Sequence, residues 1–266
     1  GYATGVVTDK DFAVARFNMD GTLDNSFSTD RKATTDIISI DNGNSVAVQS
    51  DGKILVAGSA ASSGISDFAM VRYNTDGSLD NSFGAAGKDT TAFGTDLASG
   101  YSVVLQPDGK ILLAGIRFNF GADQNFALAR DDTDGSLDNS FGSGGKVTTA
   151  FVGGDFGYAV AIEPDGKIVM AGYTTNTQYY YFALARYGTD GALDAGFGDA
   201  GKVTSELTAY GDHGYSVAIQ PDGKIVVAGS GYVGVDTEYD FEVARYNSGA
   251  VGISDIPIAK NASVIY

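Results

Sequence analysis

The chain contains no cysteine and no tryptophan, only four prolines and a single histidine. The absence of cysteine excludes disulfide bonds, thiolate zinc sites and thiol catalysis. No apolar run approaches about 20 residues, so we expect no membrane-spanning helix, and no signal peptide is visible. The lone histidine, His213, lies beside an aspartate in the segment 209–214, which is more typical of a surface residue than of a general base. Catalysis therefore has little support.

Basic residues are also scarce, with 17 Lys and Arg against 33 Asp and Glu and a formal net charge of −16. Such a surface repels phosphate backbones, so nucleic acid is not expected as a partner. The charge is compatible with calcium binding and with solubility outside the cell. Hydrophobic residues make up 43% of the 266 residues, and 37 residues are glycine. This composition is typical of one large all-β domain with many tight turns.

A repeat of 57 residues runs through the chain. Its most constant part is the tetrapeptide Asp-Gly-Lys-Ile. The tetrapeptide begins at Asp51, Asp108, Asp165 and Asp222, so each copy follows the previous one after 57 residues (51 to 108, 108 to 165, 165 to 222). A period in this range indicates stacked or radially arranged supersecondary units. Residue types that recur once per repeat are therefore explained more readily as scaffold than as an active site. Gly1 aligns with Gly58, so we expect that the chain starts within a repeat and that upstream sequence, including any export signal, is missing.

One repeat reads as four short strands. Residues 101–106 alternate and are rich in β-formers, and the turn signal Pro-Asp-Gly at 107–109 leads into a second strand over 110–115. A third strand is predicted over 125–130 and a fourth over 146–151. Each repeat is thus a four-stranded antiparallel meander, and we name its strands A to D in chain order.

The predicted fold is a β-propeller, because a meander cannot bury both faces alone and radial repetition solves this. A β-solenoid is the alternative, but its coils are shorter. Five C strands, which begin near Phe12, Phe68, Phe126, Phe182 and Phe241, predict five blades, unless upstream sequence adds to them. The propeller is expected to span residues 1–250.

The repeat resembles the delta-60 repeat family of bacterial secreted and surface proteins. The residues that carry the resemblance are 68–84, which run from Phe68 to Gly84, then Gly87-Lys88, 101–103 and 106–111. This resemblance implies a propeller that is exported to the extracellular space or the bacterial cell surface, with no defined biochemical activity. Residues 261–266 also resemble the lead-in to the C-terminal sorting domain of type IX secretion substrates. Residues 251–266 are accordingly a final strand or a linker towards a missing sorting domain.

Each C strand carries one arginine, and the loop after it carries aspartates. A buried arginine needs a carboxylate partner, so a structural salt bridge once per blade is predicted; the alternative is a ring of arginines that grips an anion. We expect Arg130→Ala to destabilise the protein by a few kcal/mol. The residues of this series are Arg16, Arg72, Arg130, Arg186 and Arg245, with Asp24, Asp80, Asp138 and Asp194.

The same loops space oxygen side chains by two residues, a pattern that calcium loops share. Asx turns explain the pattern equally well, and no other cofactor is expected. The candidate calcium ligands are Asn74, Asp76, Asp80, Asp132, Asp134 and Asp138.

The segments between strands B and C vary between repeats and contain aromatic residues. Tyr and Phe on loops held by a rigid scaffold are typical of recognition surfaces; alternatively, they only cover the ends of the sheets. The candidate binding residues are Phe118, Phe120, Tyr173, Tyr179, Tyr180, Tyr181, Tyr232 and Tyr239.

The first functional hypothesis is a non-enzymatic binding or adhesion module at the cell surface, whose partner is a protein or a glycan. A carbohydrate-active hydrolase is the alternative, and it needs two carboxylates at glycosidase spacing. Its candidates are the acids that do not follow the repeat: Asp96, Asp155, Asp212, Asp236 and Glu238. A third hypothesis is a purely structural spacer in a larger surface protein.

Overall fold

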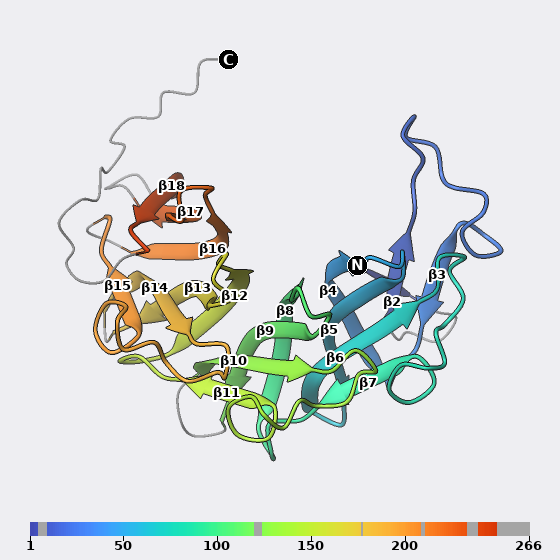
Figure 1. Cartoon of the computed structure of the whole chain (residues 1–266), viewed down its shortest axis with the longest axis horizontal. Coiled ribbons are helices and arrows are strands. Elements are labelled where there is room, and N and C mark those ends of the chain that lie inside the picture. Colours follow the sequence, from blue (N-terminus) through green and yellow to red (C-terminus); the bar gives the residue numbers. More distant parts are fainter. Residues whose placement is uncertain (5–9, 120–123, 177, 209–210, 233–238, 249–266) are drawn as a thin grey trace. The chain divides into compact units, whose positions relative to one another are not determined.

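The computed structural model describes residues 1–4, 10–119, 124–176, 178–208, 211–232 and 239–248 (Figure 1). Every regular element in these ranges is a strand, and none of them is a helix. No helix long and apolar enough to cross a membrane occurs in the described part of the chain. The predicted segment 251–266 lies outside the described residues.

The chain divides into two compact units, Gly1–Thr148 and Thr149–Tyr266. The first unit contains a seven-stranded sheet, ordered β1-β2-β4-β5-β6-β7 with β3 paired to β2, and a four-stranded sheet, β8 to β11. Its strands are β1 (Tyr2–Thr4), β2 (Lys10–Ala15), β3 (Lys32–Thr35), β4 (Ile40–Val48), β5 (Ile54–Ser62), β6 (Ile65–Tyr73), β7 (Lys88–Thr91), β8 (Leu97–Leu105), β9 (Ile111–Phe118), β10 (Gln124–Asp131) and β11 (Lys146–Thr149).

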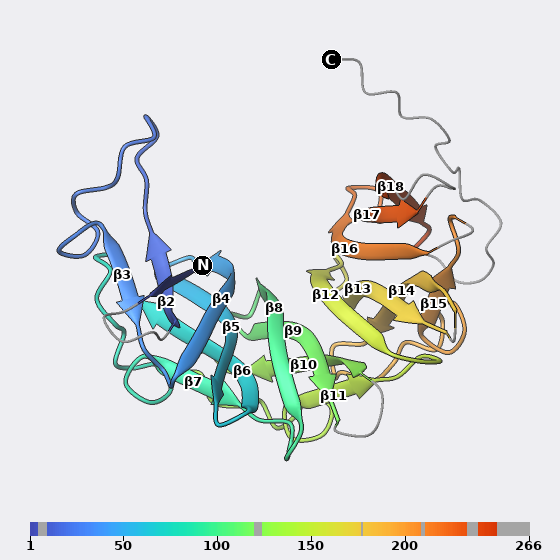
Figure 2. The same ribbon diagram turned by 180° about the vertical axis from the view of Figure 1, so that it is seen from behind.

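The second unit contains a four-stranded sheet, β12 to β15, and a three-stranded sheet, β16 to β18 (Figure 2). Its strands are β12 (Asp155–Ile162), β13 (Ile168–Thr175), β14 (Tyr180–Tyr187), β15 (Lys202–Ser205), β16 (Asp212–Ile219), β17 (Ile225–Tyr232) and β18 (Tyr239–Tyr246). Neighbouring strands within each four-stranded sheet follow chain order. The predicted antiparallel meander of strands A to D is therefore confirmed.

Strand A is longer than the sequence predicted. In the third repeat it begins at Leu97 rather than at residue 101, and a β-bulge between Gly100 and Ser102 interrupts its pairing with β9. The bulge brings two backbones close together: a Cβ atom on Gly115 would lie 2.0 Å from the Ser99 carbonyl oxygen. Only glycine fits there, which explains why this glycine recurs in every repeat.

Consecutive blades bury their apolar faces against each other. In the first unit, Leu55 and Phe68 of one blade pack with Leu113 and Ala129 of the next. In the second unit, Phe182 and Val227 meet in the same way. The C-strand phenylalanines Phe68, Phe126 and Phe182 are fully buried. The core of this protein therefore lies between blades, as a propeller requires.

The repeated arginine joins its own blade to the following one. Arg72 Nε donates to Asp80 Oδ2 at 2.7 Å, and the guanidinium lies 4.5 Å from the centre of the Phe83 ring. Its Nη1 donates to the carbonyl oxygen of Thr133, in the loop after strand C of the next blade. Within the second unit, Arg186 bonds Asp194 and the Ser248 carbonyl in the same arrangement.

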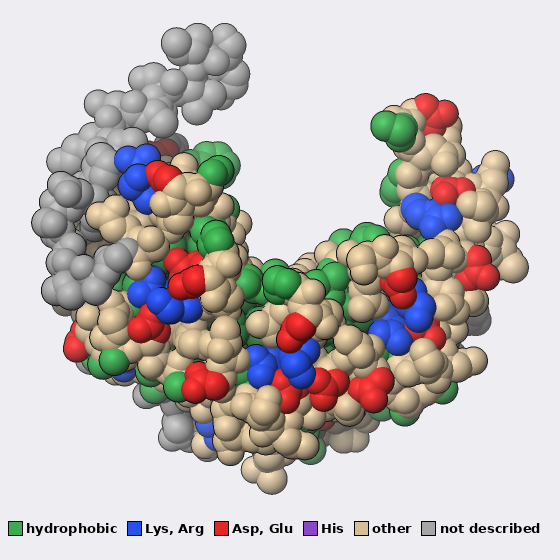
Figure 3. Space-filling view, in the orientation of Figure 1, with side chains coloured by type: hydrophobic (Ala, Val, Ile, Leu, Met, Phe, Trp, Pro, Cys, Tyr) green, Lys and Arg blue, Asp and Glu red, His purple; other side chains and the backbone are tan. Residues whose placement is uncertain are grey.

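Two further predicted pairs are in contact, Arg16 with Asp24 and Arg130 with Asp138. Arg245 forms no ion pair with any described residue, and its repeat has Ser248 where the others have an aspartate-containing loop. On the face shown in Figure 3, basic and acidic side chains lie beside each other at several places.

The Asp80 carboxyl is held in its charged form. Burial alone would raise its pKa, but hydrogen bonds from Ser82, Lys53 and Arg72 together hold the pKa far below its usual value. Its stabilising contribution is therefore present above pH 4 and is lost only as the pH falls well below that value.

We predict that Arg72→Ala lowers the free energy of unfolding by roughly 3–5 kcal/mol, because it leaves Asp80 buried without its guanidinium partner. Arg16→Ala is the matched control, since Arg16 makes the same contacts but its side chain is 32% exposed against 6% for Arg72. The control should lose much less. Chemical denaturation at pH 7 measures both, and equal losses would contradict a stabilising role for the buried pair.

Candidate ligand-binding site

Eight rings gather in the second unit, around the only histidine of the chain. We call this group the His213 cluster; its members are Phe156, Tyr158, Tyr173, Tyr180, His213, Tyr215, Tyr232 and Tyr239. They come from β12, β13, β14, β16, β17 and β18, so both blades of the unit contribute.

The imidazole contacts tyrosines on several sides. Its ring centre lies 4.4 Å from that of Tyr180 and 4.6 Å from that of Tyr173. Tyr239 lies 5.9 Å away, and Tyr215 lies 6.2 Å away with its plane only 9° from parallel. These separations are typical of stacked and edge-to-face aromatic pairs, so the cluster forms one continuous aromatic surface.

Strand register places these side chains. Phe156 is directly opposite Tyr173 across the β12–β13 pair, and the two rings stack 4.7 Å apart. Tyr232 is directly opposite Tyr239 across the β17–β18 pair. Directly opposed side chains in an antiparallel pair lie close enough for aromatic contact, so the backbone alone determines these two contacts.

Several rings of the cluster remain accessible to solvent. Tyr180, Tyr215 and Tyr239 are 40%, 48% and 62% exposed. Tyr173 and His213 are less accessible and are half-buried. Large aromatic faces that remain exposed beside buried ones are typical of ligand-binding surfaces. The chemistry on offer is stacking against an apolar ring face, with tyrosine hydroxyls as hydrogen-bonding groups.

The side chains of the His213 cluster are uncharged at pH 7. Burial lowers the pKa of His213, and the neighbouring Asp212 only partly opposes this effect. Burial also raises the pKa of Tyr173 and of Tyr215. The His213 Nδ1 atom is buried and has no hydrogen-bond partner among the described residues. An uncharged imidazole therefore lies among uncharged phenols.

Half of the predicted binding residues belong to this cluster. The structure brings together Tyr173, Tyr180, Tyr232 and Tyr239, but it places them within or at the ends of strands rather than on loops. In two repeats, much of the predicted variable segment is paired strand instead: β5 and β6 pair as far as Ser62 and Ile65, and β13 and β14 pair as far as Thr175 and Tyr180.

The other predicted residues lie elsewhere. The Tyr181 hydroxyl accepts a hydrogen bond from the Asn176 side chain. The backbone of Tyr179 donates its N–H to Asn176 Oδ1 and accepts the Asn176 N–H at its carbonyl oxygen. Phe118 ends β9 in the first unit, and Phe120 lies outside the described residues.

Sequence reasoning missed Phe156, Tyr158, His213 as a cluster member, and Tyr215. A signal was available for two of them, because Phe156 and His213 depart from the repeat: their position holds Asn42 and Ser99 in the first unit. Tyr158 and Tyr215 share their position with Tyr101, so the repeat gives no signal for them. The scaffold of the other repeats forms without such departures. Residues that depart from the repeat are therefore candidates for a binding role.

Two acids lie beside the cluster, but both are buried. Asp212 is fully buried and accepts hydrogen bonds from the Leu207 and Thr208 backbone N–H groups. Glu242 is 9% exposed, and its Oε2 atom has no hydrogen-bond partner among the described residues. Burial, followed by the nearby Asp212, raises the pKa of Glu242 to about 8. Glu242 is therefore protonated at pH 7, and it replaces an alanine found in the other repeats, such as Ala183.

The other candidate acids are occupied structurally. Asp155 accepts hydrogen bonds from Phe151 N–H and from the Thr174 hydroxyl. Asp96 forms an ion pair with Arg117. Asp236 and Glu238 lie outside the described residues.

In the proposed calcium loops, the oxygen atoms bind the loop itself. Asp76 Oδ1 accepts from the N–H and the hydroxyl of Ser78, and Asp134 does the same with Ser136. Asp132 pairs with Lys110, Asp80 and Asp138 pair with arginines, and Asn74 bonds Ser78 through its amide nitrogen. Asx turns and ion pairs thus account for all six residues.

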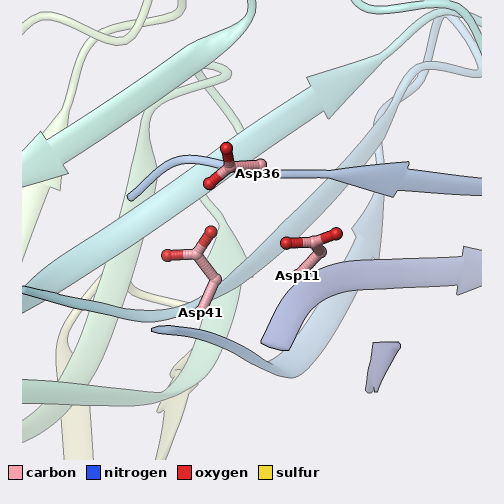
Figure 4. Close-up of side chains that lie close together, drawn as sticks. All are labelled: Asp11, Asp36 and Asp41. Atoms are coloured by element: carbon pink, nitrogen blue, oxygen red, sulfur yellow. The ribbon is translucent and has the colours of Figure 1, made fainter. Parts of the chain in front are cut away.

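A separate group of acids, Asp11, Asp36 and Asp41, lies in the first unit with carboxylate oxygens within 4.8 Å of one another (Figure 4). Asp41 accepts hydrogen bonds from the N–H groups of Ile37 and Ile38. Asp155 and Asp212 follow Asp41 at repeat spacing and bind the preceding turn in the same way. The position of Asp41 is therefore explained by the turn that it closes.

Comparison with solved structures gives matches of low sequence identity. A protein of unknown function from Bacteroides caccae is 14% identical, with a TM-score of 0.48, over 88% of this chain and 68% of that one. An endo-arabinase from Bacteroides thetaiotaomicron is 12% identical, with a TM-score of 0.43, over 75% and 73%. A fucose lectin from Kordia zhangzhouensis is 16% identical, with a TM-score of 0.30, over 56% and 93%. None of the curated proteins compared with the chain matches it significantly.

A family model matches the chain in five segments, residues 1–27, 49–83, 106–141, 163–197 and 220–249. Each segment includes a C strand and the loop after it, so the matches follow the repeat found in the sequence and the blades found in the structure. The protein belongs to the β-propeller family described as a domain of unknown function, DUF5122.

Proposed function

We propose that this propeller is a non-catalytic saccharide-binding module that acts outside the bacterial cell and binds its ligand on the His213 cluster. The observation that carries the proposal is the gathering of exposed tyrosines around an uncharged imidazole, which itself lies at a position that holds Asn42 and Ser99 in the first unit. The pyranose and furanose rings of neutral sugars present apolar C–H faces that stack on aromatic rings, and hydroxyls that pair with phenol groups and with an imidazole nitrogen.

The charge of the chain supports a neutral ligand. With a formal net charge of −16, the protein repels anionic partners at a distance. Within the described part of the cluster, no lysine or arginine stacks on one of its rings. A phosphorylated or sulfated ligand would therefore lack a counter-charge at this surface, whereas a neutral glycan needs none.

The acids beside the cluster support binding rather than hydrolysis. Glycosidases place two carboxyl groups about 5–9.5 Å apart on opposite sides of the scissile bond. Asp212 and Glu242 are instead both buried, and Asp212 accepts hydrogen bonds from the backbone N–H groups of the segment that leads into its own strand. Two buried carboxyl groups are poorly placed to reach a sugar or an attacking water from opposite sides.

We predict that Tyr180→Ala and Tyr215→Ala each weaken saccharide binding at least about tenfold, since each removes an exposed stacking face worth about 1.4 kcal/mol or more. Binding is measured by calorimetry against a panel of neutral pentose, hexose and deoxyhexose oligosaccharides. Tyr101→Ala is the control, because Tyr101 holds the repeat position of Tyr215 in the first unit. Unchanged affinity in both cluster variants, or equal loss in the control, would contradict the proposal.

We predict that Glu242→Gln leaves saccharide binding unchanged and protects the protein at alkaline pH. Because the pKa of Glu242 in the folded protein is raised to about 8, its favourable contribution is complete below its ordinary pKa of 4.5 and is lost as the pH rises through 8. The melting temperature of the wild type should therefore decline between pH 5 and 8 more steeply than that of the variant, and the two should run parallel above pH 8. If the variant abolished release of sugars from an oligosaccharide, the protein would be a hydrolase.

A further inference from the structure

A second departure from the repeat lies in the first unit, between the blade β4–β7 and the blade β8–β11. The residue after the repeated arginine of strand C is aromatic in the other repeats, at Phe17, Tyr73, Tyr187 and Tyr246, but it is Asp131 here. The second residue of strand D is Ala33, Val147 or Val203 in the other repeats, but it is Asp89 here. Both changes replace an uncharged residue by a carboxylate.

The two acids face the same interface. Asp89 pairs with Met70 across β6 and β7, and Met70 packs towards the next blade in the core. Asp131 follows Ala127 and Ala129 on one face of β10, and both alanines belong to the same core cluster. The equivalent residues at another interface, Ala33 and Tyr73, also share one core cluster. Strand alternation therefore directs both carboxylates into one buried place.

The carboxylate oxygens of Asp131 lack partners. Asp131 is fully buried, and neither Oδ1 nor Oδ2 accepts a hydrogen bond from any described residue. At two other interfaces the tyrosine hydroxyl bonds a threonine of strand D, Tyr73 with Thr35 and Tyr187 with Thr149, each at 2.7 Å. Here the equivalent residue, Thr91, is buried and lies with its hydroxyl 3.5 Å from Asp89 Oδ2. Aspartate is shorter than tyrosine, so Asp131 places its carboxylate oxygens in the space that the phenol ring fills in those repeats.

No basic side chain of the described residues forms an ion pair with Asp89 or Asp131. The charged groups that act on Asp131 are Asp89, Asp132 and Asp138, and all of them are acidic. After burial, which is the main cause, these acids raise the pKa of Asp131 to about 8, and burial raises the pKa of Asp89 to about 6. A buried carboxylate is unfavourable unless it is paired or coordinates a metal, and here the missing partner is a cation.

We infer that Asp89 and Asp131, with the Thr91 hydroxyl, hold a divalent cation between these two blades. All the available ligand atoms are oxygens, which select a hard ion, and calcium fits an irregular set of carboxylate and hydroxyl oxygens better than magnesium does. The site is distinct from the loops that follow the C strands, whose oxygens are already bonded within the loop. Its role is structural, since it joins two blades at the one interface of the first unit that lacks the tyrosine–threonine hydrogen bond.

The test compares the wild type with Asp89→Val/Asp131→Tyr, which restores the residues of the other repeats, after treatment with EDTA and dialysis at pH 8. We expect the wild type to bind one calcium ion per chain by metal analysis. Its melting temperature should rise by about 5 °C or more in excess calcium and less in magnesium. The double variant should bind no ion at this place and show no rise.

Two further variants keep the test decisive. Asp131→Asn preserves the shape of the side chain and should also lose the ion. It therefore provides the test even if the double variant fails to fold. Asp36→Ala removes an acid of the other cluster and should leave calcium binding unchanged. A wild type that binds neither ion, or an ion that is retained by Asp131→Asn, would overturn the inference and leave a protonated acid pair at this interface.

Discussion

The structure depends on one contact that is repeated from blade to blade: an arginine at the end of strand C that bonds an aspartate of its own blade and a backbone carbonyl of the next. Arg72 shows that this one contact involves the loop of its own blade, an aromatic ring and the loop of the next blade. Its guanidinium closes the loop through Asp80, covers the Phe83 ring and fixes the next loop at Thr133. Apolar burial between blades is not directional, so this contact supplies the orientation that burial lacks.

Most of the scaffold could be predicted from the sequence, because a strand or turn predicted in one repeat can be compared with the same positions in the others. The meander, the tight turns and the arginine–aspartate pairs all follow from residues that recur. The bulged start of strand A could not be predicted, since the alternation of residues 97–101 is broken by a glycine whose purpose is a close backbone approach. The expectation of loops between strands B and C was wrong for much of residues 59–66 and 173–181, because polar and aromatic residues there pair as strands as far as Ser62 with Ile65 and Thr175 with Tyr180.

The candidate site was only half predictable, for a related reason. Aromatic residues between strands B and C were visible as variable segments, and Tyr173 and Tyr180 were found that way. Phe156, His213 and Tyr215 lie on strand A, where the sequence looks like ordinary scaffold. What distinguishes Phe156 and His213 is a departure from the repeat, and the same signal marks Glu242, Asp89 and Asp131. Tyr215 keeps the tyrosine of Tyr101 and Tyr158, so the repeat gives no signal for it. In a repeat protein, function is best sought where one copy differs from the rest.

His213 gives the most direct test of the account, because it is the only histidine in the chain and lies at the centre of the aromatic cluster. Its ring protons give a single set of NMR resonances that needs no assignment. The account predicts that these resonances shift progressively and saturate when a neutral oligosaccharide that binds the protein is added at pH 7. Saturable binding that leaves the His213 resonances unchanged would contradict it, because the ligand would then lie elsewhere on the propeller.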